Sequence, residues 1–213
     1  MLLMENGRLD EAETYIEGAL STHVQTRNQR RRGTTLLSLA GLRARQGRLE
    51  EAEVLVTEAV DVMRRVGYLR FEAVSWLNLG AMRFARGKLQ EAVESLSKAI
   101  NQARTVGDPL TLGLALAYMS AVLAESGELD GARRTHERAR ESLRGLSTDQ
   151  TLGIMDAARG FLDLADARAA TEDHEAALHV RAARSALGGM RTNQTGSAQF
   201  IASILDNALQ EFA

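Results

Sequence analysis

The four histidines are the chain's only nitrogen ligands of the kind that commonly bind zinc, and the chain has no cysteine. A zinc site on one helix needs two histidines four residues apart on the same face, with a third ligand nearby. His174 and His179 are five residues apart, and neither has a second ligand in register. His23 and His136 stand alone in the sequence. We therefore interpret all four as surface histidines and predict neither a metal site nor a cofactor.

Paired carboxylates are the second kind of candidate, because two of them can act as general acid and general base. The acidic pairs at 10–11 and 50–51 fall in a repeated hexapeptide at the expected starts of helices, where acidic side chains stabilise the helix dipole. Asp163 and Asp166 are three residues apart, and the nearest cation on the same helix face is Arg159. A local ion pair therefore accounts for these carboxylates.

Motifs that bind phosphate or activate a nucleophile are absent from the sequence. There is no Gly-x-x-x-x-Gly-Lys-Ser/Thr loop, no Gly-x-Gly-x-x-Gly and no Gly-x-Ser-x-Gly elbow. We predict that the chain is not an enzyme.

One local basic cluster, Arg-Asn-Gln-Arg-Arg-Arg at residues 27–32, could bind phosphate groups. The net charge of −2 and the interspersed acidic and basic residues argue against nucleic acid as a partner. The cluster falls between two units of the chain, where solvated charge is the ordinary interpretation. Phosphate binding is kept as the alternative.

The first residues become charged too soon for a signal peptide, and no apolar run approaches the roughly 20 residues that cross a bilayer. These features, with the lack of cysteine, predict a soluble cytoplasmic protein with no membrane partner. Lysine occurs only at Lys88 and Lys98 while arginine is abundant, which is typical of a GC-rich genome and favours a bacterial origin.

The elements that carry these residues repeat with a period of 40. Ala12, Ala52, Ala92 and Ala132 each end a version of the same hexapeptide, as in Gly-Arg-Leu-Asp-Glu-Ala. A fixed period of this length indicates one supersecondary unit repeated in tandem.

The third unit shows the pattern most clearly. Apolar residues recur at helical spacing over 71–83, Gly87 then ends this helix, and a second amphipathic run starts at Leu89. Asp108 and Pro109 open the next helix as N-cap and first helical residue. Each unit is therefore predicted to be a helix, a tight turn and a second helix.

Small residues are expected where the two helices of a unit cross closely. We expect Gly80 and Ala92, which are 12 residues apart, to form this contact in the third unit. The same spacing relates Ala40 to Ala52 and Ser120 to Ala132.

These residues resemble the tetratricopeptide repeat family. Its pattern of Trp-x2-Leu-Gly followed by Ala-x3-aromatic is matched by Trp76, Leu79 and Gly80, and by Ala92 with Leu96 in the aromatic position. The resemblance implies an all-α fold, a right-handed solenoid of antiparallel helix pairs with a C-terminal capping helix.

The departures from the family pattern are specific. Arg83 stands where the family has a tyrosine, and the period is 40 rather than about 34. Longer units of this kind resemble the variant found in bacterial regulatory ATPases, large transcription activators and kinesin light chains.

The array is predicted to cover residues 1–190, followed by a linker at 191–196 and a capping helix at 197–213. Ser147 and Gln150 have capping-box spacing and would start a fifth first helix. The alternative for the last helix is the first helix of a sixth repeat. The units are a partial first repeat at 1–26 and repeats at about 31–66, 71–106, 110–145 and 148–187.

The partial first repeat would leave a second helix without its partner. This indicates either a fragment of a longer array or a surface for homodimer formation.

In the family, the first helices of the repeats line a groove that holds a partner segment. Carried over to this chain, the resemblance implies that Leu37, Ser38, Arg45, Val74, Leu77, Asn78, Phe84, Leu114, Tyr118, Arg159 and Asp163 face this groove. The surface suits an amphipathic helix or an extended apolar peptide better than a terminal carboxylate, which calls for several Lys or Arg. The competing interpretation is that these positions pack against neighbouring units.

We expect a non-catalytic scaffold for protein–protein interaction, with a protein or peptide partner, within a bacterial regulatory or signalling protein. The alternative is a sensor domain that binds a small effector on the same face. A sensor requires an enclosed pocket with convergent polar groups, whereas a scaffold has an open groove.

Overall fold

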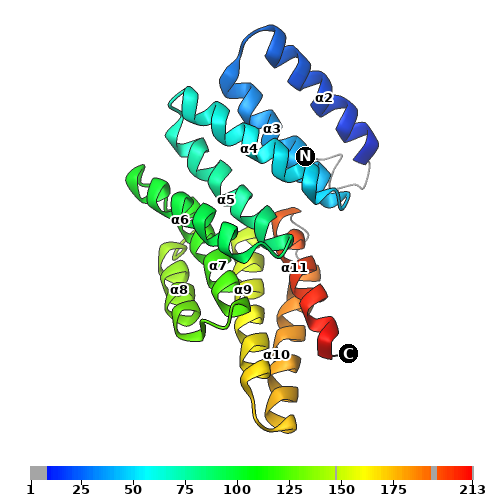
Figure 1. Ribbon diagram of the computed structural model, residues 1–213, viewed down its shortest axis with the longest axis vertical. Coiled ribbons are helices and arrows are strands. Elements are labelled where there is room, and N and C mark those ends of the chain that lie inside the picture. The colour runs from blue at the N-terminus through cyan, green and yellow to red at the C-terminus, as the bar shows by residue number, and fades with distance from the viewer. Residues whose placement is uncertain (1–8, 147, 193–195, 213) are drawn as a thin grey trace. The chain divides into compact units, whose positions relative to one another are not determined.

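The computed structural model describes residues 9–146, 148–192 and 196–212, in which every secondary-structure element is helical (Figure 1). The predicted all-α solenoid of antiparallel helix pairs is confirmed. The elements are α2 (Leu9–Gln25), α3 (Gln29–Arg45), α4 (Leu49–Arg65), α5 (Leu69–Ala85), α6 (Leu89–Thr105), α7 (Pro109–Glu125), α8 (Leu129–Ser142), α9 (Asp149–Ala169), α10 (Asp173–Thr192), α11 (Gly196–Ala208) and a 3-10 turn η1 (Leu209–Phe212).

The glycine turns end the helices where the sequence predicts. Gly87 follows the end of α5 with φ of +71°, a left-handed conformation that favours glycine. Its backbone N–H donates to the carbonyl of Phe84 at 2.9 Å, and the N–H of Lys88 donates to that of Arg83 at 2.9 Å. These bonds satisfy two of the carbonyls that the helix end leaves free.

Asp108 caps α7 as predicted, and Pro109 is the first residue of that helix. The Asp108 carboxylate accepts from the Thr111 backbone N–H at 3.2 Å and from the Thr111 hydroxyl at 3.0 Å. Both bonds satisfy groups in the first turn of the helix.

The cap of α9 differs from the prediction. The N-cap is Thr148, whose hydroxyl accepts from the Thr151 N–H at 3.2 Å, and the Thr151 hydroxyl accepts from the Thr148 N–H at 2.8 Å. Ser147, the predicted N-cap, lies outside the described residues. A second threonine performs the reciprocal role that a Glu or Gln has in the usual capping box.

The chain divides into two compact units, Met1–Thr111 and Leu112–Ala213. In unit 1, each of the helices α2 to α6 contacts the next. Here α3 and α5 are first helices of repeats, and α4 and α6 are second helices. The largest core side chains are at most 2% exposed: Leu36, Leu42, Val56, Met63, Leu79 and Leu96.

In the third repeat, Gly80 of α5 meets Leu96 of α6, which lies one turn beyond Ala92. A Cβ on Gly80 would be 2.6 Å from Cγ and 2.7 Å from Cδ2 of Leu96, so α5 rests on the Leu96 side chain at this point. Ala92 is nevertheless fully buried. The missing side chain at position 80 is what admits Leu96.

In unit 2, α9 contacts α8, α10 and α11. Its side chains Ile154, Phe161 and Leu164 are at most 1% exposed. A Cβ on Gly160 would be 2.5 Å from Cδ2 of Leu205, so α11 also packs at a residue without a side chain. We keep the capping role of α11 as a prediction.

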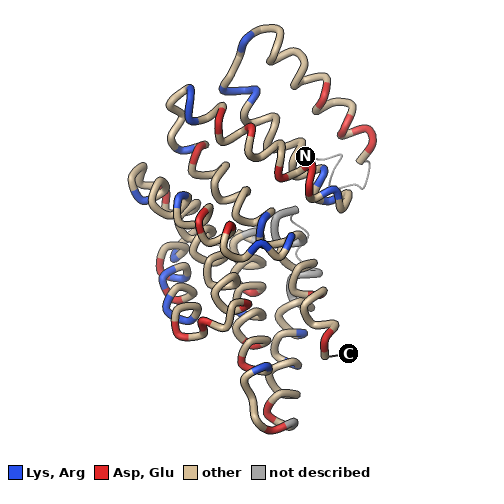
Figure 2. Tube along the Cα trace, viewed as in Figure 1, with Lys and Arg blue, Asp and Glu red and all other residues tan. Residues whose placement is uncertain are grey.

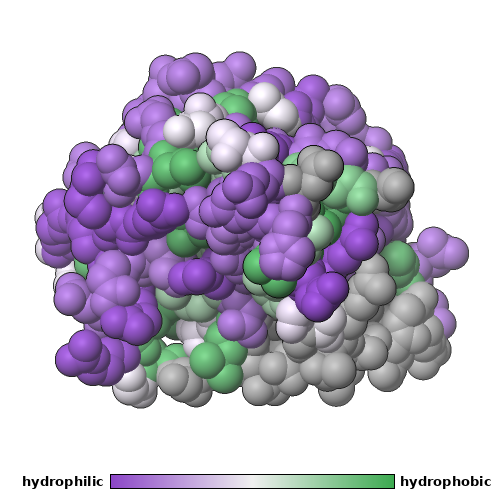
Figure 3. All heavy atoms as spheres, turned by 90° about the horizontal axis from the view of Figure 1, so that it is seen from below, coloured by the Kyte–Doolittle hydropathy of each residue, from purple (hydrophilic) through white to green (hydrophobic). Residues whose placement is uncertain are grey.

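Among the described helices, none combines the length and hydrophobicity that a membrane-spanning segment needs. On the face drawn in Figure 3, apolar residues are scattered among hydrophilic ones.

Candidate interaction surface

The first-helix face of unit 1 is formed by α3 and α5, which contact each other directly. We define it by the residues that lie along one side of these helices and keep solvent exposure: Thr34, Leu37, Ser38, Gly41, Arg45, Val74 and Asn78. Gly41 marks its open centre, because a Cβ built there meets no atom within 4 Å. No described element therefore covers this side of α3 at that point.

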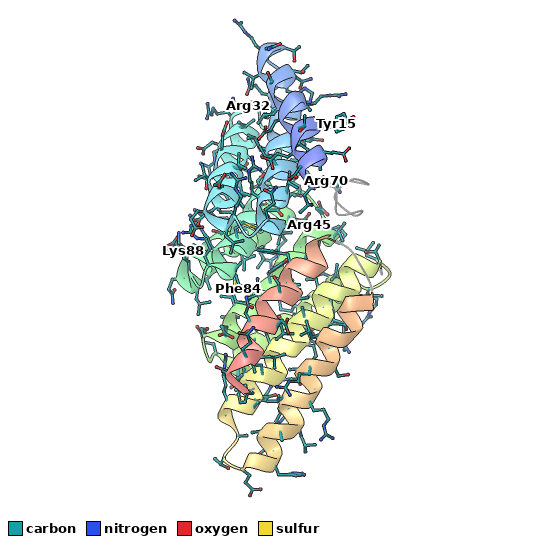
Figure 4. All side chains as sticks on the ribbon, turned by 90° about the vertical axis from the view of Figure 1, so that its right-hand side faces the viewer. Tyr15, Arg32, Arg45, Arg70, Phe84 and Lys88 are labelled. Carbon is teal, nitrogen blue, oxygen red and sulfur yellow. The ribbon has the colours of Figure 1, made fainter. Side chains whose placement is uncertain are left out.

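The first-helix face offers apolar contacts, hydrogen-bonding groups and one cation. Leu37 and Val74 are half-buried aliphatic side chains. Asn78 is half-buried and donates from Nδ2 to the carbonyl of Val74 at 2.8 Å, and its Oδ1 can accept a further hydrogen bond. Arg45 has no carboxylate partner within the described residues, and α3 contains no acidic residue. In Figure 4, Arg45 lies on the opposite side of this unit from Lys88.

Besides Asp163, which is described below, four of the predicted groove residues are buried. Leu77 is 8%, Phe84 3%, Leu114 7% and Tyr118 4% exposed. Burial also raises the pKa of Tyr118 well above its ordinary value, so its hydroxyl stays protonated. We leave these four out of the surface that we propose below.

Arg159 and Asp163 form the local ion pair that their spacing indicates, with Nε and Oδ1 3.3 Å apart. Arg159 is exposed and Asp163 is 6% exposed. Asp166 also forms an ion pair, with Arg133 of α8 at 2.5 Å. His179 of α10 completes a cluster with both aspartates. The sequence did not indicate this grouping, since His179 has no ligand partner at helical spacing along the chain.

One ligand atom each from Asp163, Asp166 and His179 lie within 4.8 Å of one another, an arrangement that could hold a divalent cation. Both carboxylates are already paired with a guanidinium, from Arg159 and Arg133. A metal ion would have to compete with these cations at close range. We therefore interpret the cluster as a network that ties α9 to its neighbours.

The buried carboxyl in this network gives a stability prediction. Burial raises the pKa of Asp163, and Arg159 offsets this effect only in part. The ionised carboxylate therefore destabilises the folded chain. This loss of stability begins as the pH rises through 3.8, the ordinary pKa, and is complete above the higher pKa of the folded chain. We expect Asp163→Asn to raise the Tm at pH 7 by roughly 2–4 °C, measured by circular dichroism, and to have no such effect below about pH 3. A lower Tm at pH 7 would mean that the ion pairs outweigh the burial cost.

A second polar network lies on α4, where this helix meets the α5–α6 connection. A hollow of about 490 Å³ is lined there by α4 and by the α5–α6 connection. Glu53, which is 9% exposed, accepts from Arg83 at 3.3 Å and from Lys88 at 3.1 Å, and also pairs with Arg86. These partners lie 30 to 35 residues from Glu53 in the sequence, so no local pattern predicted the network.

Comparisons with known proteins place the chain among helical repeat proteins. The sequence profile of the tetratricopeptide repeat matches residues 1–65 and 71–145. A search of curated proteins finds no significant match.

Three solved structures with similar folds are distant from this chain in sequence. BtubC (BKLC) from P. vanneervenii has a TM-score of 0.66 at 18% identity, covering 89% of this chain and 77% of that one. A Rap protein complexed with competence and sporulation factor has a TM-score of 0.69 at 15% identity, covering 99% of this chain. This chain spans 62% of that Rap protein. The TPR-like repeats of a putative kinesin light chain from Podosopora anserina have a TM-score of 0.61 at 18% identity, covering 91% of this chain and 92% of that one.

Proposed function

Because the chain belongs to the tetratricopeptide repeat family, we propose that it is a non-catalytic interaction module whose first-helix face holds a helical or extended segment of a partner protein. Repeats of this family typically serve protein–protein interaction. The Rap protein of similar fold was solved in complex with competence and sporulation factor, which supports a binding role for such an array. The arginine-rich composition supports a bacterial origin, and we place the module within a regulatory or signalling protein.

The observation that carries this proposal is the open surface around Gly41. A partner backbone can approach α3 closely at a residue that has no side chain. Leu37 and Val74 would cover apolar side chains of the partner, while Asn78 and Arg45 would provide polar contacts that fix its orientation.

A partner segment fits this face better than a small effector does. Small-molecule sites enclose most of their ligand and bring several polar groups together. The first-helix face is open at its centre, and its polar groups Ser38, Asn78 and Arg45 are spread over two helices. The sensor alternative would require a closed pocket elsewhere in the chain.

A blocking substitution tests the proposal. Gly41→Trp places a large ring in the open space of the face without disturbing the core. We expect peptides selected from a random library on the unmodified protein to lose at least about tenfold in affinity for this variant, because a ring at the centre prevents close approach. Fluorescence anisotropy of the selected peptides measures the effect.

The matched control is Gly188→Trp on α10, where an added Cβ also meets nothing within 4 Å. This variant should bind the selected peptides as the parent does. Peptides that bind Gly41→Trp as tightly as the parent would place the binding surface elsewhere and contradict the proposal.

Homodimer formation through α2 stays a prediction. Tyr15 on this helix is 71% exposed and points away from the unit in Figure 4.

A further inference from the structure

The connections from second to first helices bring arginines to one edge of unit 1. Consecutive helices run in opposite directions, so the α2–α3 and α4–α5 connections and the end of α6 lie at the same end of the unit, where Figure 2 shows blue segments. We call this the basic edge. Its arginines include Arg27, Arg30, Arg31, Arg65, Arg70 and Arg104.

Contacts between the connections make the basic edge one continuous surface. The guanidinium of Arg30 lies over the ring of Tyr68, 5.1 Å from its centroid, and joins the first connection to the second. Arg70 donates to Asp108 at 3.1 Å and joins the second to the third. In the sequence, only the arginines at 27–32 form a basic cluster. The other arginines are far away along the chain and come to lie beside this cluster only when the repeats stack.

Most of the positive charge at this edge is not neutralised within the chain. Arg27, Arg31, Arg65 and Arg104 are exposed, and no carboxylate in the described part of the chain pairs with them. The acidic Asp108 nearby is buried and already engaged by Arg70 and Thr111. An exposed guanidinium group without a carboxylate partner can bind a carboxylate of another protein through two parallel hydrogen bonds.

Beside each connection, a helix end exposes an aliphatic side chain. Val24 is 52%, Leu69 46% and Leu110 43% exposed. A phosphate backbone would gain nothing from these side chains, whereas a protein segment with apolar residues would cover them. The recurrence of an exposed aliphatic residue beside arginine at each connection favours a protein partner over a nucleic acid.

We propose that the basic edge docks an acidic segment of a partner protein in which Asp or Glu alternates with aliphatic or aromatic residues. Charge complementarity steers the segment to the arginines, and the aliphatic side chains fix its register. This surface is distinct from the first-helix face, so either one can bind without the other.

The test uses the full chain and a labelled synthetic peptide that repeats Glu-Glu-Leu over about twelve residues. We expect binding that weakens strongly between about 50 and 500 mM salt. The triple variant Arg31→Glu, Arg65→Glu, Arg104→Glu should lose at least about tenfold in affinity, because three attractions become repulsions. The matched control is Arg134→Glu, Arg138→Glu, Arg181→Glu in unit 2, which changes the net charge equally and should keep the affinity.

A second arm separates partner classes. The double variant Leu69→Ser, Leu110→Ser should bind the peptide severalfold more weakly than the parent does. Its binding of single-stranded oligothymidylate of similar length, if any, should be unchanged. The neutral variant Arg31→Gln, Arg65→Gln, Arg104→Gln should also bind the peptide more weakly than the parent does, without charge reversal. Circular dichroism checks that this variant is folded. Tighter binding of the oligonucleotide than of the peptide would overturn the assignment to a protein partner. Equal loss in the unit 2 control, or no binding of the peptide at low salt, would overturn the docking surface itself.

Discussion

Replacement of Leu96 by alanine is expected to lower the free energy of unfolding by about 2–5 kcal/mol, because this side chain is fully buried where α5 and α6 meet. Gly80→Ala alone should cost about 1–3 kcal/mol, since its new methyl group would lie 2.6 Å from Cγ of Leu96. Chemical denaturation followed by circular dichroism measures both changes.

The two changes should not add. In the double variant, the methyl group at position 80 fills part of the space that Leu96 vacates, so the combined loss should be smaller than the sum of the two. Gly41→Ala is the matched control for the glycine change, because it also lies inside a helix but has open space around it. It should stabilise the chain by up to about 1 kcal/mol. Additive losses would mean that Gly80 and Leu96 do not share the contact.

Features that depend on a few neighbouring residues could be predicted from the sequence. The left-handed turn at Gly87, the Asp108 cap and the pairing of Arg159 with Asp163 all follow from spacings within one turn or one helix. The period of 40 fixed the helix-pair unit in the same way. These are short-range consequences of backbone geometry, which every copy of the repeat shares.

Contacts between helices could not be predicted with the same detail. Ala92 and Leu96 lie on one face of α6, four residues apart, so helical periodicity alone does not say which of them meets Gly80. The structure selects Leu96. The register between two helices depends on the shapes of the side chains along the whole contact.

Burial was the least predictable property of the candidate surface. The family pattern places Phe84 and Tyr118 beside the signature residues, but their exposure depends on what packs around each helix. The same limit applies to the basic edge, where Arg70 becomes a neighbour of the 27–32 cluster only when the repeats stack. A one-dimensional sequence indicates that cluster and leaves the rest of the edge unassigned.

Glu53→Gln is expected to lower the free energy of unfolding at pH 7 by about 2–3 kcal/mol. Glu53 is 9% exposed, and its carboxylate binds Arg83 and Lys88 across the boundary between two repeats. Loss of one member of a fully buried pair costs about 3–5 kcal/mol, and the partial exposure of the cations here reduces that figure. Glu50→Gln is the control, because Glu50 pairs with Arg86 but its side chain is 74% exposed, and it should cost less than about 1 kcal/mol.

The effect of Glu53 should depend on pH in one direction. Burial alone would raise the pKa of Glu53, but hydrogen bonds from Lys88, Arg86 and Arg83 outweigh it and hold the pKa below 4.5, the ordinary value. A carboxyl with a lowered pKa contributes stability above its unfolded value and loses that contribution as the pH falls through its folded value. The difference between the parent and Glu53→Gln should therefore be constant above about pH 5 and shrink steadily below 4.5. A difference that stayed the same down to about pH 3 would mean that the shape of the side chain, rather than its charge, joins the two repeats.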